Sequence, residues 1–282
     1  MTVWERKRID SLHNDTLKAL IKILGTSGNM KEQGIAAAEG LHLAACFVGR
    51  PQFKLDAVFV PDERMEDPVW LDMLGALQAQ QPFNVKGKPL TLFEMPMVVF
   101  KKLSKLNTPT GPLLVFKTPG KGAAQSLLKP LKMDSDVVVL DGVQDPGNVG
   151  TLLRNCAAAG ISQVVCTEGT AWVWNDKVLR AGMGAQFELT IHDEEALLAA
   201  LANAPHTPVR VTSLQTGAID VFAADLRAPG IWVFGSEGQG VSPAWMSRAT
   251  QPVTIPQSNA VESLNVASSS AICLFEQIRQ RR

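Results

Sequence analysis

The sequence predicts an α/β protein whose C-terminal part contains a mainly parallel sheet. Beyond residue 112, short β-branched runs alternate with helical stretches, a pattern typical of βαβ units. The expected strands are Val137–Leu140, Gln163–Cys166, Val209–Thr212, Ile231–Phe234 and Val253–Ile255. Because ligands of open α/β sheets bind at the carboxyl ends of the strands, the loops that follow these runs are expected to carry the functional residues.

Two domains are expected for a chain of 282 residues, at about 150 residues per domain. The segment Leu106–Pro112, which contains both Pro and Gly, is the predicted linker and divides the chain into residues 1–107 and 108–282. The first domain is expected to be α/β as well, with a helix over Asp10–Leu24 and a loop at Gly25–Asn29.

The composition, with 46% hydrophobic and 19% charged residues, indicates a globular protein. The first ten residues lack the apolar core of a secretory signal, and no run reaches the ~18 apolar residues that span a bilayer, so a cytoplasmic location is expected. The four cysteines, Cys46, Cys156, Cys166 and Cys273, form no CxxC pair, and the chain has only four histidines. Buried, reduced thiols and no metal site are therefore expected.

The formal charge of zero conceals two halves of opposite sign. Residues 1–133 carry 18 Lys and Arg against 12 Asp and Glu, which is 18 − 12 = +6, and residues 134–282 carry 9 against 15, which is 9 − 15 = −6. A basic first domain could bind phosphates while the second does other chemistry, although solvated lysines on surface helices explain the same charge.

The first notable loop, Asp141–Gly150, leads from a buried strand into a helix. Its glycines permit close backbone approach, and the N–H groups at the helix start favour an anionic or polar ligand. The loop is neither GxGxxG nor a P-loop. Arg154 follows on an otherwise apolar helix and needs a partner, which is either a ligand or a surface carboxylate.

Two further loops follow later strands. Gly235–Gly240 surrounds the single carboxylate of Glu237 with glycines, and that carboxylate either accepts hydrogen bonds from a ribose or stabilises its own turn. Ile255–Ala267 leads into the final helix, where Ser263 is the expected N-cap and Asn265 adds a further donor and acceptor.

Together these loops resemble the three motifs of the SpoU, or TrmH-type, branch of the SPOUT RNA methyltransferases. The motifs occur in order as DPGNVGTLLRNCAAAG, VFGSEGQGVS and VTIPQSNAVESLNVASSS, within residues 137–282. The stretch around Glu39 and Gly40 also resembles the small α/β RNA-binding domain, related to a ribosomal-protein fold, that many members carry.

The resemblance implies a trefoil knot in the C-terminal domain and a homodimer with an active site shared across its interface. It implies methyl transfer from S-adenosylmethionine to a ribose 2′-hydroxyl of structured RNA, and the extra N-terminal domain favours ribosomal RNA over transfer RNA. The cofactor would bind in the knot through backbone groups of Gly235, Ile255 and Leu264.

The family motifs place the reaction centre at Asn148, Arg154, Glu237, Ser263 and Asn265. By resemblance Arg154 acts on the ribose hydroxyl, from the same subunit or from its partner. A guanidinium holds its proton above pH ~12, so orientation of the target phosphate and hydroxyl is the favoured role. Asn148 and Asn265 would position ribose and loop backbone, and Glu237 would anchor the site.

One part of the third motif departs from the family, which often has Met after Ile-Pro and Gly soon afterwards. This chain has Gln257, Ser258 and Asn259 there. The departure bears on the shape of the cofactor-facing loop and on substrate preference, more than on the reaction class.

Two other functions stay open at this point. A non-catalytic RNA-binding relative could keep the knot without methyl transfer, but the presence of Arg154 and Glu237 counts against it. A dinucleotide-dependent oxidoreductase is disfavoured because the chain lacks GxGxxG and an acidic residue at the expected strand end.

Overall fold

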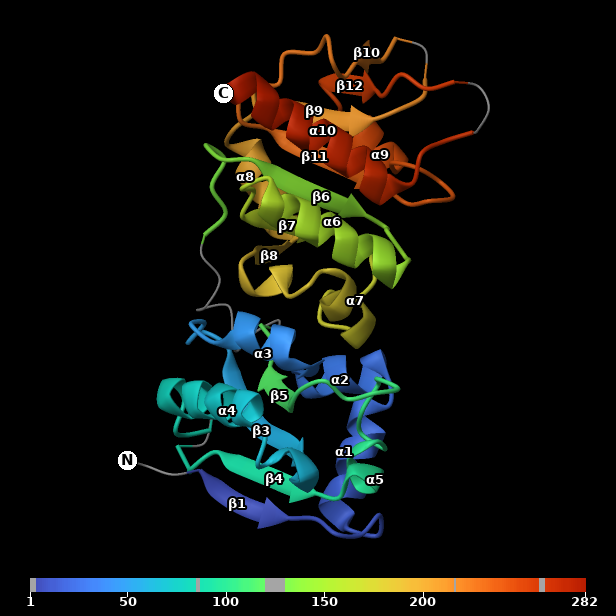
Figure 1. The fold of residues 1–282 in the computed structure, drawn as a ribbon. Helices are drawn as coiled ribbons and strands as arrows, with labels where there is room; N and C mark the ends of the chain where they lie inside the picture. The colour runs from blue at the N-terminus through green and yellow to red at the C-terminus, as the bar shows by residue number, and fades with distance from the viewer. Residues whose placement is uncertain (1–3, 85–86, 120–129, 216, 259–261) are drawn as a thin grey trace. The chain divides into compact units, whose positions relative to one another are not determined.

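The computed structural model describes residues 4–84, 87–119, 130–215, 217–258 and 262–282. The chain divides into two compact units (Figure 1). The first comprises Met1–Leu127 with Trp174–Leu179, and the second comprises Leu128–Val173 with Arg180–Arg282.

The first unit is built on a mixed sheet with the strand order β1-β4-β3-β5-β2. Strands β1, β4 and β3 run parallel to one another, whereas β5 runs antiparallel to both β3 and β2. The strands are β1 (Glu5–Arg8), β2 (Ile35–Glu39), β3 (Lys54–Pro61), β4 (Thr91–Met95) and β5 (Leu113–Lys117). The α-helices are α1 (Asp15–Leu24), α2 (Ser27–Gln33), α3 (Leu41–Phe47), α4 (Pro68–Gln80) and α5 (Met97–Phe100), and a 3-10 turn, η1, spans Asp62–Arg64.

Side-chain caps decide where the first helices begin. The Asn14 side chain accepts a hydrogen bond from the backbone N–H of Leu17, so α1 starts later than the expected Asp10. The prediction of a loop over Gly25–Asn29 is wrong from Ser27 onward, because a further helix, α2, begins there. Thr26 caps this helix by accepting a hydrogen bond from the N–H of Asn29.

The predicted domain boundary at residue 107 differs from the observed division. The predicted linker lies within the first unit, because β5 follows it and pairs between β3 and β2. Gly111 is packed so closely that a Cβ atom there would lie 2.1 Å from the backbone nitrogen of Leu41. A chain cut at residue 107 would therefore separate β5 from the rest of its sheet.

The second unit contains a seven-stranded sheet with the order β10-β12-β9-β11-β6-β7-β8, and every pair in it is parallel. Its strands are β6 (Val137–Asp141), β7 (Gln163–Cys166), β8 (Thr190–Asp193), β9 (Val209–Thr212), β10 (Ile219–Asp220), β11 (Ile231–Gly235) and β12 (Gln251–Thr254). Its helices are α6 (Pro146–Ala158), α7 (Asp176–Ala181, shared with the first unit), η3 (Ala185–Phe187), α8 (Glu194–Ala202), α9 (Pro243–Met246) and α10 (Val266–Arg281). The expected parallel α/β sheet is confirmed, and β8 and β10 are strands that the sequence did not predict.

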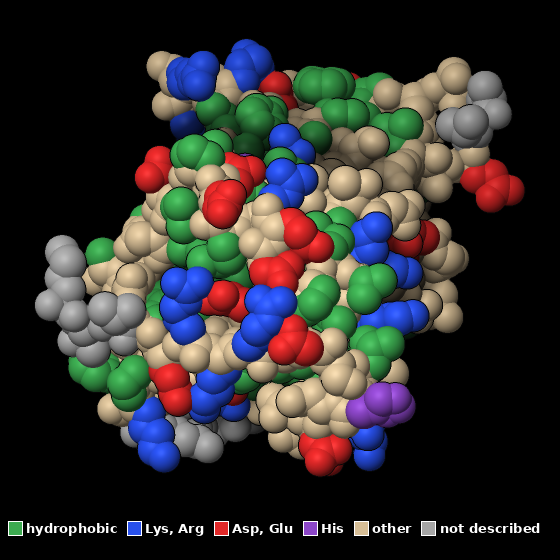
Figure 2. Space-filling model, turned by 60° about the horizontal axis from the view of Figure 1, so that its bottom comes forward, with side chains coloured by type: hydrophobic (Ala, Val, Ile, Leu, Met, Phe, Trp, Pro, Cys, Tyr) green, Lys and Arg blue, Asp and Glu red, His purple; other side chains and the backbone are tan. Residues whose placement is uncertain are grey.

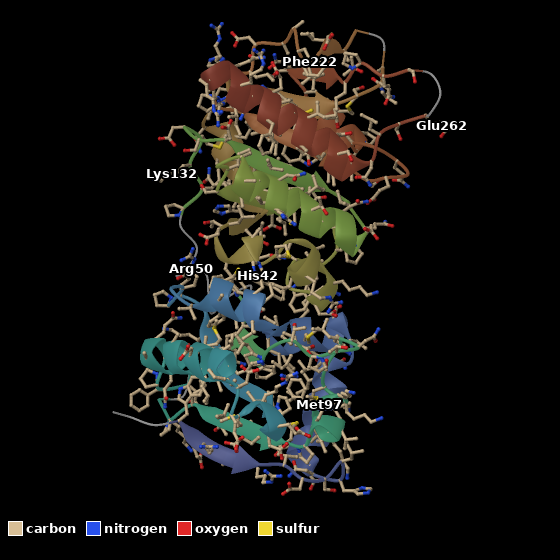
Figure 3. All side chains as sticks on the ribbon, in the orientation of Figure 1. His42, Arg50, Met97, Lys132, Phe222 and Glu262 are labelled. Atoms are coloured by element: carbon tan, nitrogen blue, oxygen red, sulfur yellow. The ribbon has the colours of Figure 1, made fainter. Side chains whose placement is uncertain are left out.

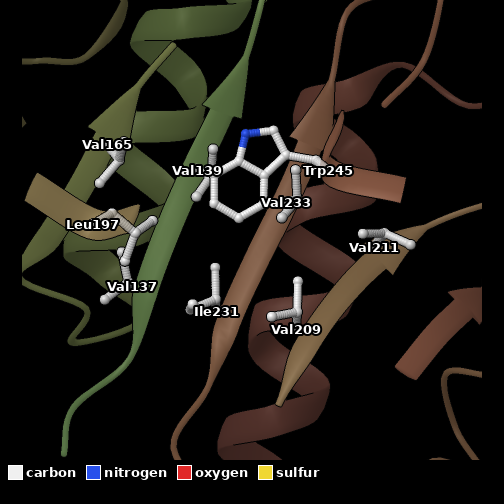
Figure 4. Close-up of a cluster of buried hydrophobic side chains, with 9 residues drawn as sticks. All are labelled: Val137, Val139, Val165, Leu197, Val209, Val211, Ile231, Val233 and Trp245. Carbon is white, nitrogen blue, oxygen red and sulfur yellow. The ribbon is translucent and has the colours of Figure 1, made fainter. Parts of the chain in front are cut away.

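Helices cover both faces of this sheet. On one face, alternate strand residues form an apolar cluster with Leu197 of α8 and Trp245 of α9 (Figure 4). On the other face α6 and α10 pack against each other, and α10 also packs against β11 (Figure 1). Because the side chains of a strand alternate, burial on both faces explains why these strands are almost wholly apolar.

A buried polar network fastens α10 to the sheet. The indole nitrogen of Trp232 donates to Gln277 Oε1 at 2.8 Å, and Gln277 Nε2 donates to Asp136 Oδ2 at 3.2 Å. Arg281 forms an ion pair with the same aspartate. The guanidinium of Arg210, 1% exposed, donates to the carbonyl of Ala228 and lies over the Trp232 ring. These groups satisfy one another inside an otherwise apolar layer.

None of the four cysteines, all of which the structure describes, forms a disulfide, and two of them, Cys156 and Cys273, are buried as expected. Cys46 and Cys166 are partly exposed by surface area. Burial raises the pKa of Cys273 to about 12, so this thiol stays protonated and unreactive at neutral pH. Within the described residues, no helix is both long and apolar enough to cross a membrane.

The close packing of Gly111 predicts that Gly111→Ala destabilises the first unit by about 2 kcal/mol or more, because the new Cβ meets backbone atoms that cannot rotate away. Gly75→Ala is the matched control, because Gly75 lies within helix α4 and a Cβ atom there would have no neighbouring atom within 4 Å. The control substitution should raise the free energy of unfolding by ~0.5–1 kcal/mol. Urea denaturation measures both, and equal midpoints for the two variants would contradict the packing argument.

Burial lowers the pKa of His192, although the Asp193 carboxylate opposes the effect. Its Nε2 is buried without a hydrogen-bond partner among the described residues. Because the unfolded chain binds this proton at a higher pH than the folded chain, the free energy of unfolding should fall as pH drops below ~6.5. It should level off below the folded pKa.

Urea denaturation at pH values of about 7.5 and 5.5 measures this loss. The variant His192→Leu should lose less stability than wild type, whereas the exposed control His206→Leu should behave as wild type. An unchanged loss in His192→Leu would mean that other groups cause it.

Candidate functional site

Three loops of the second unit meet through one asparagine. Asn148 of α6 donates from Nδ2 to Glu237 Oε1 at 2.7 Å, and its Oδ1 accepts from Asn265 Nδ2 at 2.9 Å. Glu237 follows β11, and Asn265 precedes α10. The structure thus joins three predicted site residues, because Glu237 and Asn265, which lie 89 and 117 positions from Asn148 in the sequence, both bond to it.

The start of α6 sets the position of Asn148. Asp145 is the N-cap, and its carboxylate accepts from the backbone N–H of Asn148 at 2.8 Å. Pro146 occupies the first helical turn, where a missing N–H costs nothing. The cap and the proline fix the first turn and therefore the direction of the Asn148 side chain.

The glycine-rich loop after β11 is closed by its own backbone. Ser236 and Gly240 exchange two hydrogen bonds, at 3.0 and 2.9 Å, and Gly240 has a φ of 70°. A Cβ at Gly235 would lie 2.1 Å from the carbonyl carbon of Gly240, so this position requires glycine. Backbone bonds hold the turn, and the Glu237 carboxylate accepts from Asn148 rather than from a loop amide.

The third loop corrects the predicted cap of the last helix. Asn265, not Ser263, is the N-cap of α10, because its Oδ1 accepts from the N–H groups of Ala267 and Ser268 at 2.9 and 3.2 Å. The same side chain donates to Asn148 from its Nδ2. Ser263 lies two residues earlier and lines the adjacent cavity.

A cavity of about 790 Å³ lies between these loops and the residues that follow β9. Its size falls in the ~300–1,000 Å³ range of small-molecule sites. Six predicted residues line it: Gly235, Glu237, Ile255, Ser263, Leu264 and Asn265. Among the described lining residues, Glu237 and Glu262 carry carboxylates and none is Lys, Arg or His. The cavity therefore suits a ligand with a positive centre better than one with several phosphates.

Arg154 lies apart from this cluster. Its side chain is exposed on α6, and it is not among the residues that line the cavity. Across the described ranges it forms no ion pair or hydrogen bond, so the alternative of a salt bridge with a surface carboxylate is not observed. An unpaired exposed guanidinium is available to a phosphate.

Asp141 is a positioning residue that the sequence analysis did not single out. Its buried carboxylate accepts from the backbone N–H of Ser242 at 2.6 Å and from the hydroxyl of Thr167 at 3.2 Å. It thereby ties the loop after β11 to the ends of β6 and β7. In the sequence, a carboxylate directly after a run of valines could have indicated this role.

Asn155 is a second positioning residue. Its Nδ2 donates to the carbonyl of Ala267 and to the hydroxyl of Ser270, both at 2.9 Å. These bonds fasten α6 to the first turn of α10, behind the Asn148–Asn265 pair. No pattern in the sequence predicts this role, because a polar residue on an apolar helix has many uses.

Two of the three residues at which the third motif departs from the family, Gln257 and Ser258, lie within the described residues. Gln257 lines the cavity, and its Nε2 donates to the carbonyl of Glu262 at 3.5 Å. Ser258 is exposed, and Asn259 lies outside the described residues.

Comparison with known proteins agrees with the motifs. The SpoU rRNA Methylase family matches residues 135–275. Over 280 residues the chain is 29% identical to an uncharacterised tRNA/rRNA methyltransferase of Synechocystis sp., covering 97% of this chain and 94% of that protein. Over 147 residues it is 33% identical to the 23S rRNA (guanosine-2′-O-)-methyltransferase RlmB of Bordetella pertussis, covering 52% of this chain but only 60% of that protein.

A solved structure extends the similarity to the whole fold. The AdoMet-bound rRNA methyltransferase from Sinorhizobium meliloti superposes with a TM-score of 0.77 at 25% identity, covering 97% of this chain and 98% of that chain. The family match spans the strands and loops that build the cavity, and the chain belongs to the SpoU rRNA methylase family.

Proposed function

We propose that the protein transfers a methyl group from S-adenosylmethionine to a ribose 2′-hydroxyl of structured RNA, with ribosomal RNA as the favoured target. The observation that carries this proposal is the Asn148–Glu237–Asn265 cluster beside an acidic cavity. The named activities of the relatives support the same chemistry.

The residues of the cavity fit S-adenosylmethionine. When bound, this cofactor supplies a methyl group on a positively charged sulfonium, which the carboxylate of Glu237 or Glu262 favours electrostatically. Backbone groups of Gly235, Ile255 and Leu264 would hold it. A dinucleotide fits less well, because its pyrophosphate would meet two carboxylates and no basic residue of the described lining.

The protein residues act mainly by positioning. Arg154 keeps its proton at neutral pH and binds the phosphate next to the target ribose. Asn148 and Asn265 hold the ribose and the loop backbone, and Ser263 offers a hydroxyl to the same space. Holding a nucleophile in line with its target supplies much of the rate in such reactions.

The active form proposed here is a homodimer in which Arg154 of one copy serves the cavity of the other. The exposed, unpaired position of Arg154 outside the cavity lining supports this arrangement. The proposal includes the trefoil knot, in support of which β12 lies between β9 and β10 while α10 returns to α6. It also includes RNA binding by the first unit and a cytoplasmic location.

The test of the proposed function is transfer of labelled methyl from S-adenosylmethionine to RNA from cells that lack this protein, followed by nuclease digestion. The expected product is a 2′-O-methylated nucleoside. Label on a base would refute the ribose assignment. No transfer, with the cofactor still bound, would favour the non-catalytic RNA-binding relative.

Arg154→Ala should lower kcat at least ~100-fold, about 3 kcal/mol, because the target phosphate loses its guanidinium contact. S-adenosylmethionine affinity should stay within about twofold, since Arg154 does not line the cavity. Arg248→Ala, which removes another exposed arginine of the same unit, is the control. Wild-type turnover in Arg154→Ala would remove this residue from the mechanism.

Mixing two variants of reduced activity tests whether Arg154 acts across the dimer. A heterodimer of Arg154→Ala with Asn148→Asp has one site with both residues intact only if Arg154 comes from the partner. Activity should then recover to about a quarter of wild type after random subunit exchange. No recovery, with heterodimers present, would place Arg154 in its own subunit's site.

Asn148→Asp should lower activity ~10–100-fold, because the new carboxylate cannot donate to Glu237 and repels it. Adding Glu237→Gln reverses donor and acceptor, and the new aspartate can still accept from Asn265. The double variant should recover at least tenfold in kcat/KM over the single one. A double variant no better than Asn148→Asp would show that this hydrogen bond is not what the site needs.

A further inference from the structure

The positive charge of the first half of the chain comes from one segment. Residues 95–133 contain seven lysines and no Asp, Glu or Arg, which gives +7, while residues 1–94 carry 11 − 12 = −1. The formal charge of +6 over residues 1–133 is therefore not spread over the unit. A phosphate-binding surface is best sought on the part of this segment that the structure describes.

Several basic residues outside this segment are neutralised. Arg6 pairs with Glu94, Arg8 bonds to Asp10 and Asp62, and Arg64 lies 3.4 Å from Asp67. Figure 2 shows the same mixture, with Lys and Arg side chains interleaved with Asp and Glu over the face that it presents. These three arginines attract RNA weakly, because each of them already has a counter-charge.

Three lysines of the segment share the exposed side of one short stretch, Lys101–Lys105, which we name the lysine segment. It continues the turns of α5, since the N–H groups of Leu103 and Ser104 donate to the carbonyl of Phe100. Phe100 and Leu103 are buried, whereas Lys101, Lys102 and Lys105 are exposed. In the described part of the chain none of the three lysines forms an ion pair.

Two buried or capping carboxylates hold the lysine segment in place. Glu39, 8% exposed, accepts from the Ser104 hydroxyl at 2.5 Å and from the N–H of Lys105 at 3.0 Å. At the other end, the Glu63 carboxylate accepts from the N–H of Met97, which Figure 3 labels at the start of α5. The lysines therefore stand on a backbone fixed at both ends, which limits the entropy lost on binding.

We infer that the lysine segment is the surface through which the first unit binds the phosphate backbone of the substrate RNA. Lysine ammonium groups are strongly hydrated point charges that bind phosphate without reading a base. The segment thus supplies affinity and salt dependence, and leaves choice of the nucleotide to other contacts. This inference rests on the proposed function, which makes RNA the substrate.

The test compares two triple variants of the full chain by fluorescence anisotropy with a labelled RNA hairpin. Replacing Lys101, Lys102 and Lys105 by Gln should raise the Kd at least tenfold at ~150 mM salt. The slope of log Kd against log salt should fall by about 2–3, since each lost phosphate contact removes ~0.7–0.9. The control replaces Lys7, Lys18 and Lys54 by Gln, with the same change in formal charge and less than threefold loss expected.

A single variant separates placement of the lysines from their charge. Glu39→Gln removes one negative charge, so electrostatics alone predicts tighter RNA binding. If Glu39 positions the segment, affinity should instead fall about threefold or more, with the thermal midpoint recorded to confirm that the variant is folded. Tighter binding by Glu39→Gln would refute the positioning part of the inference.

The readouts distinguish failure of this inference from failure of the proposed function. Equal RNA affinity of wild type and the lysine-segment variant, or equal losses in both triple variants, would overturn the inference even if the enzyme methylates RNA. Absence of methyl transfer by wild type would refute the proposed function and leave the anisotropy comparison valid.

Discussion

The geometry of the candidate site depends on the hydrogen bonds of a single amide, that of Asn148. A primary amide offers a donor and an acceptor on one rigid plane, and here the donor meets Glu237 while the acceptor meets Asn265. A carboxylate at this position could not donate, and a hydroxyl could not span both distances. The loops after β11 and before α10 are therefore held in register by α6.

The helices behind this amide prevent it from moving alone. Asn155 ties α6 to the start of α10, and the Trp232–Gln277–Asp136 chain ties the C-terminal part of α10 to the sheet. Each bond contributes only ~1 kcal/mol net, but a buried partner left unsatisfied costs ~1–3 kcal/mol. The network thus resists rearrangement more strongly than its net energy suggests, which favours a preorganised site.

The surfaces that we propose as ligand sites in the two units carry opposite charges. The cavity of the second unit is lined by carboxylates and suits a sulfonium, whereas the lysine segment of the first unit suits phosphates.

The sequence by itself determined the parallel sheet of the second unit and most of the site, because apolar strand runs and glycine-rich loops are local patterns. Five expected strands are present, and Glu237 and Asn265 line the cavity of the second unit. Tertiary structure alone decided that Asn148 joins them, that Asn265 rather than Ser263 caps α10, and that β5 belongs to the first unit. Those outcomes depend on contacts between distant residues, such as Gly111 against Leu41, which no local periodicity encodes.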